Sequence, residues 1–362
     1  MLTHLCVKPL TLKKVLRNLS QIMLLCLSNL NLQPKSSMNS TAPDVSVLIA
    51  NWNGEHILPR CLDSIYQHTQ QVSFEIVLCD DASTDASLEL VQRNFPQVKV
   101  LVNARNLGYA ATTNRAMTLA SGRYFLLLNN DAMFENNVLL EFVRFMDATP
   151  EAGICGGLLL NPDGSHQHSF GAFPSPFAAF AELFWLRRLF PFLPPTHLGT
   201  VPRTLTRAYP VPMVVGTNLF IRASLAHALS LYDEQFVAYF EDSDLCYRAW
   251  RAGWKVFFVP SARLTHLFSY SYGGETPEKV KRQMERFLLG LSRFCYKHYL
   301  PAKAYLTLRL YRWLFFKTWL MLRLKRHFAH KARQSALELE IFRNRFGFYF
   351  LKTLTQPSAT HP

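Results

Sequence analysis

Acidic side chains occur at three places in this chain where their chemistry is suited to holding a cation or moving a proton. These places are Asp80-Asp81, Asp131 at the end of Asn129-Asn130-Asp131, and Glu241-Asp242 with Asp244. Carboxylates that meet at one place repel one another unless a cation or a proton neutralises them. A hard divalent cation, Mg²⁺ or Mn²⁺, binds one or two carboxylates together with phosphate oxygens of a substrate. The pattern therefore predicts a metal-dependent site for a phosphate-bearing ligand.

The apolar stretch from Tyr124 to Leu128 is predicted to be a buried, central strand of a parallel sheet. In open α/β sheets, ligands bind at the carboxyl ends of the strands. Asn129, Asn130 and Asp131 are therefore expected at a ligand crevice, and the other two acidic sites are expected at strand ends beside them. Taken alone, the triplet suits the N-terminal cap of the next helix equally well.

The rest of the chain alternates between strand-like and helix-like segments. Strands are expected at 45–50, 74–79, 98–101, 214–222 and 256–259, and helices at 56–67, 87–95, 109–120, 137–148 and, after the acidic residues 241–244, up to 252. This alternation with short connections predicts an α/β fold, in which helices flank a largely parallel sheet. Residues 161–212, rich in Pro, Phe and His, are expected to form long surface loops over the crevice.

Positive charge is concentrated at the two ends of the chain, whose formal net charge is +14 over 362 residues. Residues 1–37 carry five bases and no acid, residues 286–337 carry 12 bases and no acid, and residues 38–285 carry 19 bases and 23 acids. The high isoelectric point therefore does not indicate nucleic-acid binding, and no reader motif for nucleic acid is present. Seven scattered cysteines without a C-x-x-C pair favour a reducing, cytoplasmic compartment and disfavour a zinc site.

Several common signatures are missing from the sequence. Neither G-x-G-x-x-G nor G-K-[ST] occurs, so a diphosphate is expected to be held by metal, which disfavours dehydrogenases and P-loop proteins. No window of 18 uncharged apolar residues occurs, so we expect no transmembrane helix. Residues 1–40 are expected to be an extension that either precedes a true start at Met38 or forms a disordered or membrane-touching arm.

Motifs between residues 45 and 270 resemble those of family 2 glycosyltransferases in order and spacing. They are 47–54, 76–85, 106–110 with Asn114, 128–131 and 236–248. Similarity is closest to the rhamnosyltransferase-like branch that builds O-antigen and capsule. The resemblance implies a GT-A catalytic domain at 41–275, with a nucleotide-sugar half at about 41–131 and an acceptor half at about 132–275. It also implies inverting transfer of one sugar, rhamnose being plausible, from a UDP- or dTDP-sugar donor to a saccharide or polyprenyl-diphosphate-linked acceptor in cell-surface polysaccharide synthesis.

The resemblance also assigns roles to individual residues. Asp242 is expected to be the general base, with Glu241 beside it raising its pKa. Asp131 is expected to bind the Mg²⁺ or Mn²⁺ ion, and His266 either completes the metal site or has a structural role. The residues expected to contact the nucleotide sugar are Asn51, Asn53, Asp80, Asp81, Asn106, Asn114, Asn129 and Asn130. Asn129 replaces the first Asp of the usual D-x-D motif, which predicts weak metal binding until the donor diphosphate adds its oxygens.

Two further segments have open interpretations. Gly216-Thr217-Asn218 matches a family segment near the acceptor but also suits a turn or bulge. Residues 276–362 are expected to be helical, and a basic stripe of Arg309, Arg312, Arg323 and Arg326 predicts contact of residues 302–333 with an anionic membrane surface. The protein would then be peripheral at the inner face of the cytoplasmic membrane. Alternatively, the helix packs its apolar side on the catalytic domain and leaves its bases in water.

Two other functions compete with sugar transfer. One is a catalytically silent nucleotide- or sugar-binding protein of the same fold, although the presence of both Asp131 and Glu241-Asp242 disfavours it. The other is a sugar-phosphate nucleotidyltransferase, which normally needs a glycine-rich, basic N-terminal loop that this sequence lacks.

Overall fold

The computed structural model describes residues 42–190, 198–199, 206–267 and 277–328. The chain divides into two units, residues 1–41 and 42–362, and the description below concerns the second. The predicted extension at 1–40 lies outside the described residues, as do 268–276 and the end of the predicted tail from 329 onward.

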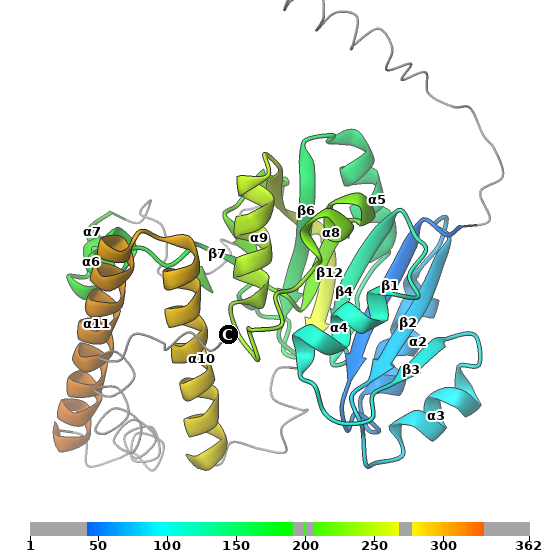
Figure 1. Ribbon diagram of the computed structural model, residues 1–362, viewed down its shortest axis with the longest axis horizontal. Helices are drawn as coiled ribbons and strands as arrows, with labels where there is room; N and C mark the ends of the chain where they lie inside the picture. Colours follow the sequence, from blue (N-terminus) through cyan, green and yellow to red (C-terminus); the bar gives the residue numbers. More distant parts are fainter. Residues whose placement is uncertain (1–41, 191–197, 200–205, 268–276, 329–362) are drawn as a thin grey trace, which may run out of the picture. The chain divides into compact units, whose positions relative to one another are not determined.

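The described elements follow one another as a typical α/β chain whose last two helices are long (Figure 1). The strands are β1 (Val45–Asn51), β2 (Phe74–Asp80), β3 (Lys99–Val102), β4 (Tyr124–Asn129), β5 (Ala132–Phe134), β6 (Ala152–Leu160), β7 (Phe170–Gly171), β8 (Leu198–Gly199), β9 (Tyr209–Pro210), β10 (Met213–Val214), β11 (Asn218–Arg222) and β12 (Lys255–His266). The helices are α2 (Leu58–His68), α3 (Ser87–Asn94), α4 (Tyr109–Met117), α5 (Val138–Ala148), α6 (Pro176–Leu183), α7 (Leu186–Leu189), α8 (Ala223–Leu229), α9 (Glu241–Arg251), α10 (Pro277–His298) and α11 (Pro301–Phe328).

The main sheet is mostly parallel, as predicted, and has the order β3-β2-β1-β4-β11-β6-β12-β5, with β9 paired to β12. β1 lies between β2 and β4 and runs parallel to both, with Asn51 opposite Asp80 and Ala50 opposite Asn129. β11 runs antiparallel between β4 and β6. The carboxyl ends of β1, β2 and β4 therefore meet at one edge of the sheet, which confirms the predicted gathering of the first two acidic sites.

Helices cover both faces of the sheet. α2 and α5 pack on one face, whereas α4, α8 and α9 pack on the other. The side chains of β4 alternate between these layers: Leu126 and Leu128 join the first, and Leu127 joins the second. All three are fully buried, and burying each such side chain stabilises the fold by about 1.5–3 kcal/mol. The structure thus confirms the central, buried strand that presents Asn129 to Asp131.

β6 is the main strand that the sequence pattern did not predict. It contains Gly153, Gly156 and Gly157, which weaken a strand pattern, yet each allows a close approach. A Cβ atom on Gly157 would lie 2.5 Å from the carbonyl oxygen of Ala262, and one on Gly156 would lie 2.8 Å from Val214 Cβ. These glycines therefore let the neighbouring elements pack directly on the strand.

A separate apolar cluster joins the two C-terminal helices to the rest of the second unit. Leu291 and Phe294 of α10 and Leu308 of α11 are buried together with Ala179 of α6 and Phe240, which directly precedes α9. Part of the predicted tail is therefore integrated into the packed protein. Within the described residues, no helix has the length and apolarity needed to cross a bilayer.

Candidate active site

The ends of β1, β2 and β4 are joined by side-chain hydrogen bonds. Asn51 Nδ2 donates to Asp80 Oδ1 at 2.9 Å, and Asn130 Nδ2 donates to Asn51 Oδ1 at 2.8 Å. Asp80 also accepts hydrogen bonds from the hydroxyl and backbone N–H of Ser83. Gly54 leaves room for this network, because a Cβ there would lie 2.3 Å from Asn51 Oδ1. Three predicted nucleotide-binding residues, Asn51, Asp80 and Asn130, are thus brought together and held rigidly.

Other predicted nucleotide-binding residues shape the loops around this network. Asp81 accepts hydrogen bonds from Asn103 Nδ2 and from the backbone N–H groups of Leu107 and Gly108, which holds the 103–108 loop. Asn106 lies exposed on that loop. Asn53 Oδ1 accepts a hydrogen bond from the backbone N–H of Thr84 at 2.8 Å, which joins the loops after β1 and β2.

Asp131 and His266 lie side by side, as the predicted metal site requires. Asp131 Oδ1 is 3.3 Å from His266 Nε2, and both residues are buried. His266 is the last residue of β12, and His266 Nδ1 is 2.6 Å from Gln167 Oε1. The amide nitrogen of Gln167 donates to Asn161 Oδ1 and to the carbonyl of His266, which identifies Oε1 as an acceptor. His266 Nδ1–H therefore donates to Gln167, and Nε2 is the ring nitrogen that faces Asp131.

This pair fits a divalent cation that takes its remaining ligands from a substrate. A carboxylate oxygen and an imidazole nitrogen are both suitable ligands for Mn²⁺, and carboxylates also bind Mg²⁺. Among the described residues, no group of three or more His, Cys, Asp or Glu side chains is placed to hold a metal. Two protein ligands would leave several coordination positions open for diphosphate oxygens.

Glu241 and Asp242 begin helix α9 rather than ending a strand, which corrects the prediction for the third acidic site. The two preceding residues, Tyr239 and Phe240, have φ angles of 66° and 72°. Residues other than glycine rarely adopt positive φ angles. Such a conformation is kept where the surrounding packing stabilises it. Phe240 is only 1% exposed, and a Cβ on Gly290 of α10 would lie 2.7 Å from the carbonyl oxygen of Tyr239. The close approach of α10 therefore supports the turn that positions the acidic pair.

The surroundings of Glu241 and Asp242 affect the pKa values of the two carboxyl groups differently. Burial raises the pKa of Glu241 to about 8, with a further contribution from the charge of Asp242. Burial also raises the pKa of Asp242, but hydrogen bonds from the backbone N–H groups of Gly216 and Ser243 oppose this rise. Asp242 Oδ2 accepts from Gly216 at 2.9 Å, and Oδ1 accepts from Ser243 at 2.6 Å. The hydrogen bonds to Asp242 thus favour its ionised form, whereas the raised pKa of Glu241 favours the protonated form of that group.

The segment Gly216-Thr217 connects Asp242 to the end of β4. The N–H of Gly216 donates to Asp242, and the carbonyl oxygen of Thr217 accepts from the N–H of Asn129 at 3.1 Å. The carbonyl oxygen of Gly216 also accepts from the Tyr109 hydroxyl at 3.2 Å. Gly216 and Thr217 thus form the turn before β11, which begins at Asn218, and this turn connects the acidic pair to the loop that carries Asp131.

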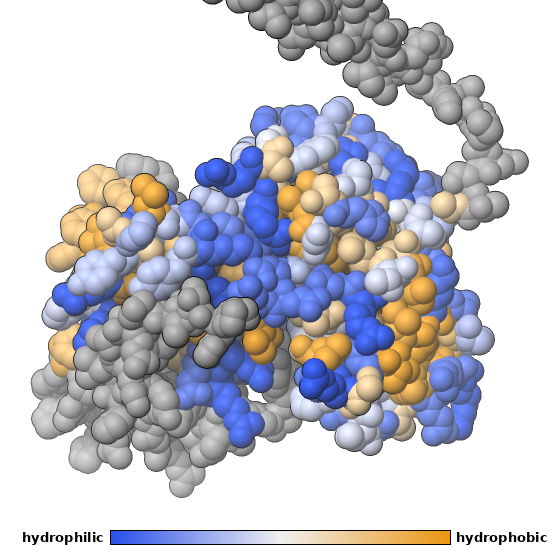
Figure 2. Space-filling model, viewed as in Figure 1, coloured by the Kyte–Doolittle hydropathy of each residue, from blue (hydrophilic) through white to orange (hydrophobic). Residues whose placement is uncertain are grey.

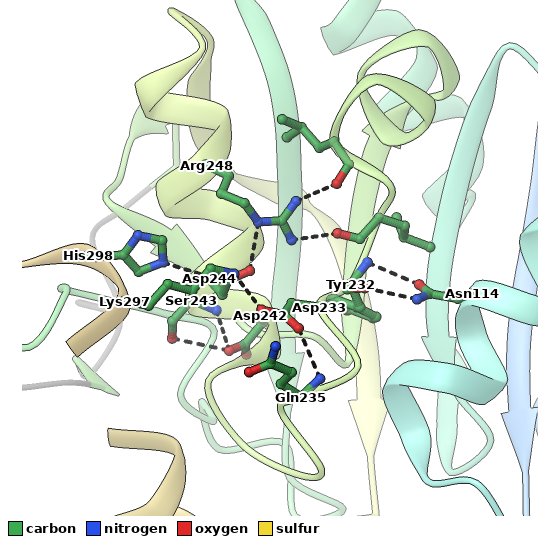
Figure 3. Close-up of polar contacts among 12 residues, drawn as sticks. Asn114, Tyr232, Asp233, Gln235, Asp242, Ser243, Asp244, Arg248, Lys297 and His298 are labelled. Atoms are coloured by element: carbon green, nitrogen blue, oxygen red, sulfur yellow. Dashed lines mark hydrogen bonds and ion pairs between the residues drawn. The ribbon is translucent and has the colours of Figure 1, made fainter. Parts of the chain in front are cut away.

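Asp244 has a different role from its two acidic neighbours, although the sequence grouped them together. Its side chain is fully buried, and it lies 2.7 Å from each of Arg248 Nε, Lys297 Nζ and His298 Nε2 (Figure 3). Burial acts to raise the pKa of Asp244, but the hydrogen bond from His298 and the charges of Arg248 and Lys297 outweigh it and lower the pKa to about 2. Asp244 therefore ties α9 to α10 and is neutralised by protein cations, not by a metal.

Asn114, another predicted nucleotide contact, holds the chain segment that leads to α9. Its amide donates to the carbonyl of Tyr232 at 2.9 Å and accepts from the N–H of Tyr232 at 3.0 Å (Figure 3). Lys297 contacts Asp233 of the same segment, and Arg248 donates to the carbonyl groups of Leu229 and Leu231. The segment before the acidic pair is thus held from α4, α9 and α10.

The contacts that sequence reasoning missed join residues far apart in the chain. Gln167 lies in a stretch expected to be loops, and Lys297 and His298 lie in the C-terminal region, 276–362, that was expected to be helical. No local pattern marks any of the three as part of the site.

Comparison with known proteins agrees with this arrangement. Residues 46–229 match the family model for glycosyl transferase family 2, and residues 196–350 match that for glycosyl transferase family group 2. The N-acetylglucosaminyl-diphospho-decaprenol L-rhamnosyltransferase of Mycobacterium tuberculosis is 29% identical over 251 residues, which are 65% of this chain and 79% of that protein.

Two solved structures share the fold at low sequence identity. A mannosyltransferase from Pyrobaculum calidifontis in complex with GDP-Man and Mn²⁺ has a TM-score of 0.52 at 15% identity, over 94% of this chain and 95% of that one. GalNAc-T7 with UDP, GalNAc and Mn²⁺ has a TM-score of 0.57 at 19% identity, over 87% of this chain and 57% of that one. These similarities establish the GT-A fold. Together with the family match over residues 46–229, they show that the chain belongs to glycosyl transferase family 2.

Proposed function

We propose that this protein transfers one sugar from a nucleotide-diphosphate donor to an acceptor hydroxyl, with inversion at the anomeric carbon. The observation that carries this proposal is the connection through Gly216-Thr217 between Asp242 and the strand end that bears Asp131. A base for the acceptor and a binding place for the donor diphosphate are thereby fixed on one rigid framework, as a direct displacement requires.

Asp242 serves as the general base of this reaction. The acceptor hydroxyl oxygen bonds to the anomeric carbon of the donor sugar while its proton passes to Asp242. The bond from the anomeric carbon to the diphosphate oxygen breaks, and its electron pair leaves on the nucleoside diphosphate. Because attack and departure occur on opposite faces of the sugar, one base suffices. The carboxyl group of Glu241, protonated at neutral pH, keeps a second negative charge away from the base.

Asp131 and His266 hold the divalent cation in this proposal, and Gln167 orients the imidazole through Nδ1. When bound, Mg²⁺ or Mn²⁺ neutralises the negative charge that develops on the leaving diphosphate. Asn51, Asp80 and Asn130 form the floor under the nucleotide, and Asn53, Asp81 and Asn106 shape its rim. The division into a nucleotide-sugar half at about 41–131 and an acceptor half at about 132–275 is part of the same proposal.

The donor is a UDP- or dTDP-sugar, with rhamnose plausible, and the acceptor is a saccharide or a polyprenyl-diphosphate-linked saccharide. The name of the mycobacterial relative supports both choices, since it denotes a rhamnosyltransferase and a diphospho-decaprenol acceptor. An acceptor of this kind places the reaction at a membrane, and residues 302–333 supply the contact with its anionic surface. The buried free thiols of Cys61, Cys79 and Cys155 suit a reducing compartment, and hence the inner face of the cytoplasmic membrane.

Donor binding tests the proposal directly. Thermal unfolding is measured with a panel of UDP- and dTDP-sugars, with and without Mn²⁺, for the wild type and for Asp131→Asn. We expect one donor to raise the unfolding temperature in a Mn²⁺-dependent manner and Asp131→Asn to lose the Mn²⁺-dependent part. Asp63→Asn, an exposed carboxylate of α2, serves as the matched control and should behave like the wild type. The absence of a shift with every donor would contradict the proposed function.

A further inference from the structure

Two helical segments far apart in the sequence lie side by side in the structure. α6 packs along α11, and Lys317 of α11 donates hydrogen bonds to the carbonyl groups of Glu182 and Leu183 at 2.8 and 2.7 Å. The ammonium of Lys317 thereby satisfies carbonyl groups at the carboxyl end of α6 and lies 3.9 Å from the centre of the Trp185 ring. The positions of α6 and α11 relative to each other are therefore fixed by specific contacts.

The sides of α6 and α11 that face the rest of the protein are buried. Ala179 of α6 and Ala304, Leu308 and Tyr311 of α11 are buried in one cluster with Phe294 of α10. This packing determines which sides of α6 and α11 face outward. One side of α11 thus packs on the protein, as the second interpretation of the tail expected.

The outward sides are nevertheless rich in large apolar residues. On α6 and in the segment through α7, Phe177, Phe180, Phe184 and Leu189 are 54%, 44%, 55% and 72% exposed. On α11, Leu306, Trp313 and Leu320 are 49%, 54% and 40% exposed. Hydrophobic colour gathers over α6, α7 and α11 in Figure 2. We call these seven residues the outer apolar face. Soluble surfaces rarely keep so many large apolar side chains together without a partner.

Charge identifies the kind of partner that this face fits. α11 contains seven bases and no acid, namely Lys303, Arg309, Arg312, Lys317, Arg323, Lys325 and Arg326. In the described residues, Arg309 is exposed on the same helix as Trp313. An anionic bilayer attracts such a helix, whereas a second copy of this chain would bring bases against bases. Phe and Trp side chains beside cations are also typical of helices that lie in a membrane interface.

We propose that α6, α7 and α11 together form one membrane-contacting surface, which lies flat on an anionic bilayer and inserts the outer apolar face. This inference rests on the membrane contact proposed above for residues 302–333 and adds α6 and α7 to it. The segment that contains α6 and α7 was expected to be a loop region over the crevice. In this arrangement, it enters the lipid interface beside α11.

Vesicle flotation of the full chain tests this inference. The probe is phosphatidylcholine vesicles with and without phosphatidylglycerol, and the variants are Phe180→Ser/Phe184→Ser and the control Val102→Ser, an exposed apolar residue on β3. We expect the wild type and Val102→Ser to float with the anionic vesicles and to stay largely unbound without phosphatidylglycerol. The double variant should bind anionic vesicles about tenfold or more weakly, because two apolar side chains no longer leave water.

The possible outcomes separate the two proposals. If the wild type does not bind anionic vesicles, membrane contact as a whole is wrong, although donor binding remains testable on its own. If the wild type binds and the double variant binds equally well, only the role of α6 and α7 is wrong. If the double variant instead abolishes a concentration-dependent dimer seen by light scattering, the face is an interface between copies.

A second measurement does not depend on the folding of the double variant. Brominated lipids should quench part of the tryptophan fluorescence of the vesicle-bound wild type, and Trp313→Phe should show less quenching, with Trp185 of the same surface still contributing. Equal quenching in both proteins would contradict insertion of the outer apolar face.

Discussion

Replacing Asp244 by Asn removes the charge that ties α9 to α10. Asp244 is fully buried, and protein cations lower its pKa from the ordinary 3.8 to about 2. At about 1.4 kcal/mol per pH unit, this difference corresponds to roughly 2.5 kcal/mol of stability at neutral pH. We therefore expect Asp244→Asn to lower the free energy of unfolding by about 2–3 kcal/mol, since Lys297, His298 and Arg248 lose their common partner.

The pH dependence gives this prediction a definite sign. The folded-state pKa of Asp244 lies below its unfolded value, so its contribution is complete above about pH 4 and is lost as the pH falls toward about 2. The free energy difference between wild type and Asp244→Asn should therefore be constant from about pH 5 to 7 and shrink as the pH falls below about 4. Urea unfolding followed by tryptophan fluorescence measures it at each pH.

Two controls make the result decisive. Asp63→Asn changes an exposed carboxylate and should alter the free energy of unfolding by less than about 0.5 kcal/mol. Lys297→Met removes one of the cations around Asp244 and should cost less than Asp244→Asn, because Arg248 and His298 remain. If Asp244→Asn were as stable as Asp63→Asn at pH 7, the link between α9 and α10 would not stabilise the protein and the reasoning would be refuted.

Three further predictions concern the active site. Gln167→Leu should raise the Mn²⁺ concentration for half-maximal transfer by about 10–100-fold, since the tautomer of His266 is no longer fixed; an unchanged Mn²⁺ titration would argue against this role. The kcat/KM of the wild type should rise with pH through an apparent pKa above the ordinary Asp value of 3.8. The reason is that burial raises the pKa of Asp242, which must be ionised to act as the base. A rate independent of pH between about 4 and 7 would oppose the assignment. Gly54→Ala should weaken donor binding by about tenfold or more in calorimetry, because the added methyl would lie 2.3 Å from Asn51 Oδ1, and wild-type affinity would show that the network tolerates displacement.

The part of the sheet formed by β1, β2 and β4 follows from strong local patterns. β1, β2 and β4 are largely apolar strands that end in polar residues, and α2 and α5 have clear helical periodicity. Each of these signals lies within a dozen residues, so propensity and burial act in the same direction. The placement of Asp80 and Asn129 at the same edge of the sheet then follows from the parallel arrangement.

β6 and the surroundings of α9 were harder to predict because their structure depends on distant contacts. The glycines of β6 weaken the strand pattern of its sequence. They are needed because Val214 and Ala262 approach the backbone of this strand closely. Phe240 adopts a positive φ before α9 because the aromatic cluster and α10 hold it, so a strand end was expected where a helix begins. The partners of His266 and Asp244 are 99 and 54 residues away in the chain, and nothing in the local sequence of Gln167 or His298 marks them.

The assignment of Asp242 as the general base is the central claim, and the Asp242→Asn variant tests it most directly. Single-turnover transfer and nucleotide-sugar binding are measured side by side for this variant, the wild type and Asp63→Asn. We predict that Asp242→Asn slows transfer by about 10²–10⁴-fold while its donor affinity and unfolding temperature stay close to those of the wild type. Transfer by Asp242→Asn at the wild-type rate would contradict the account.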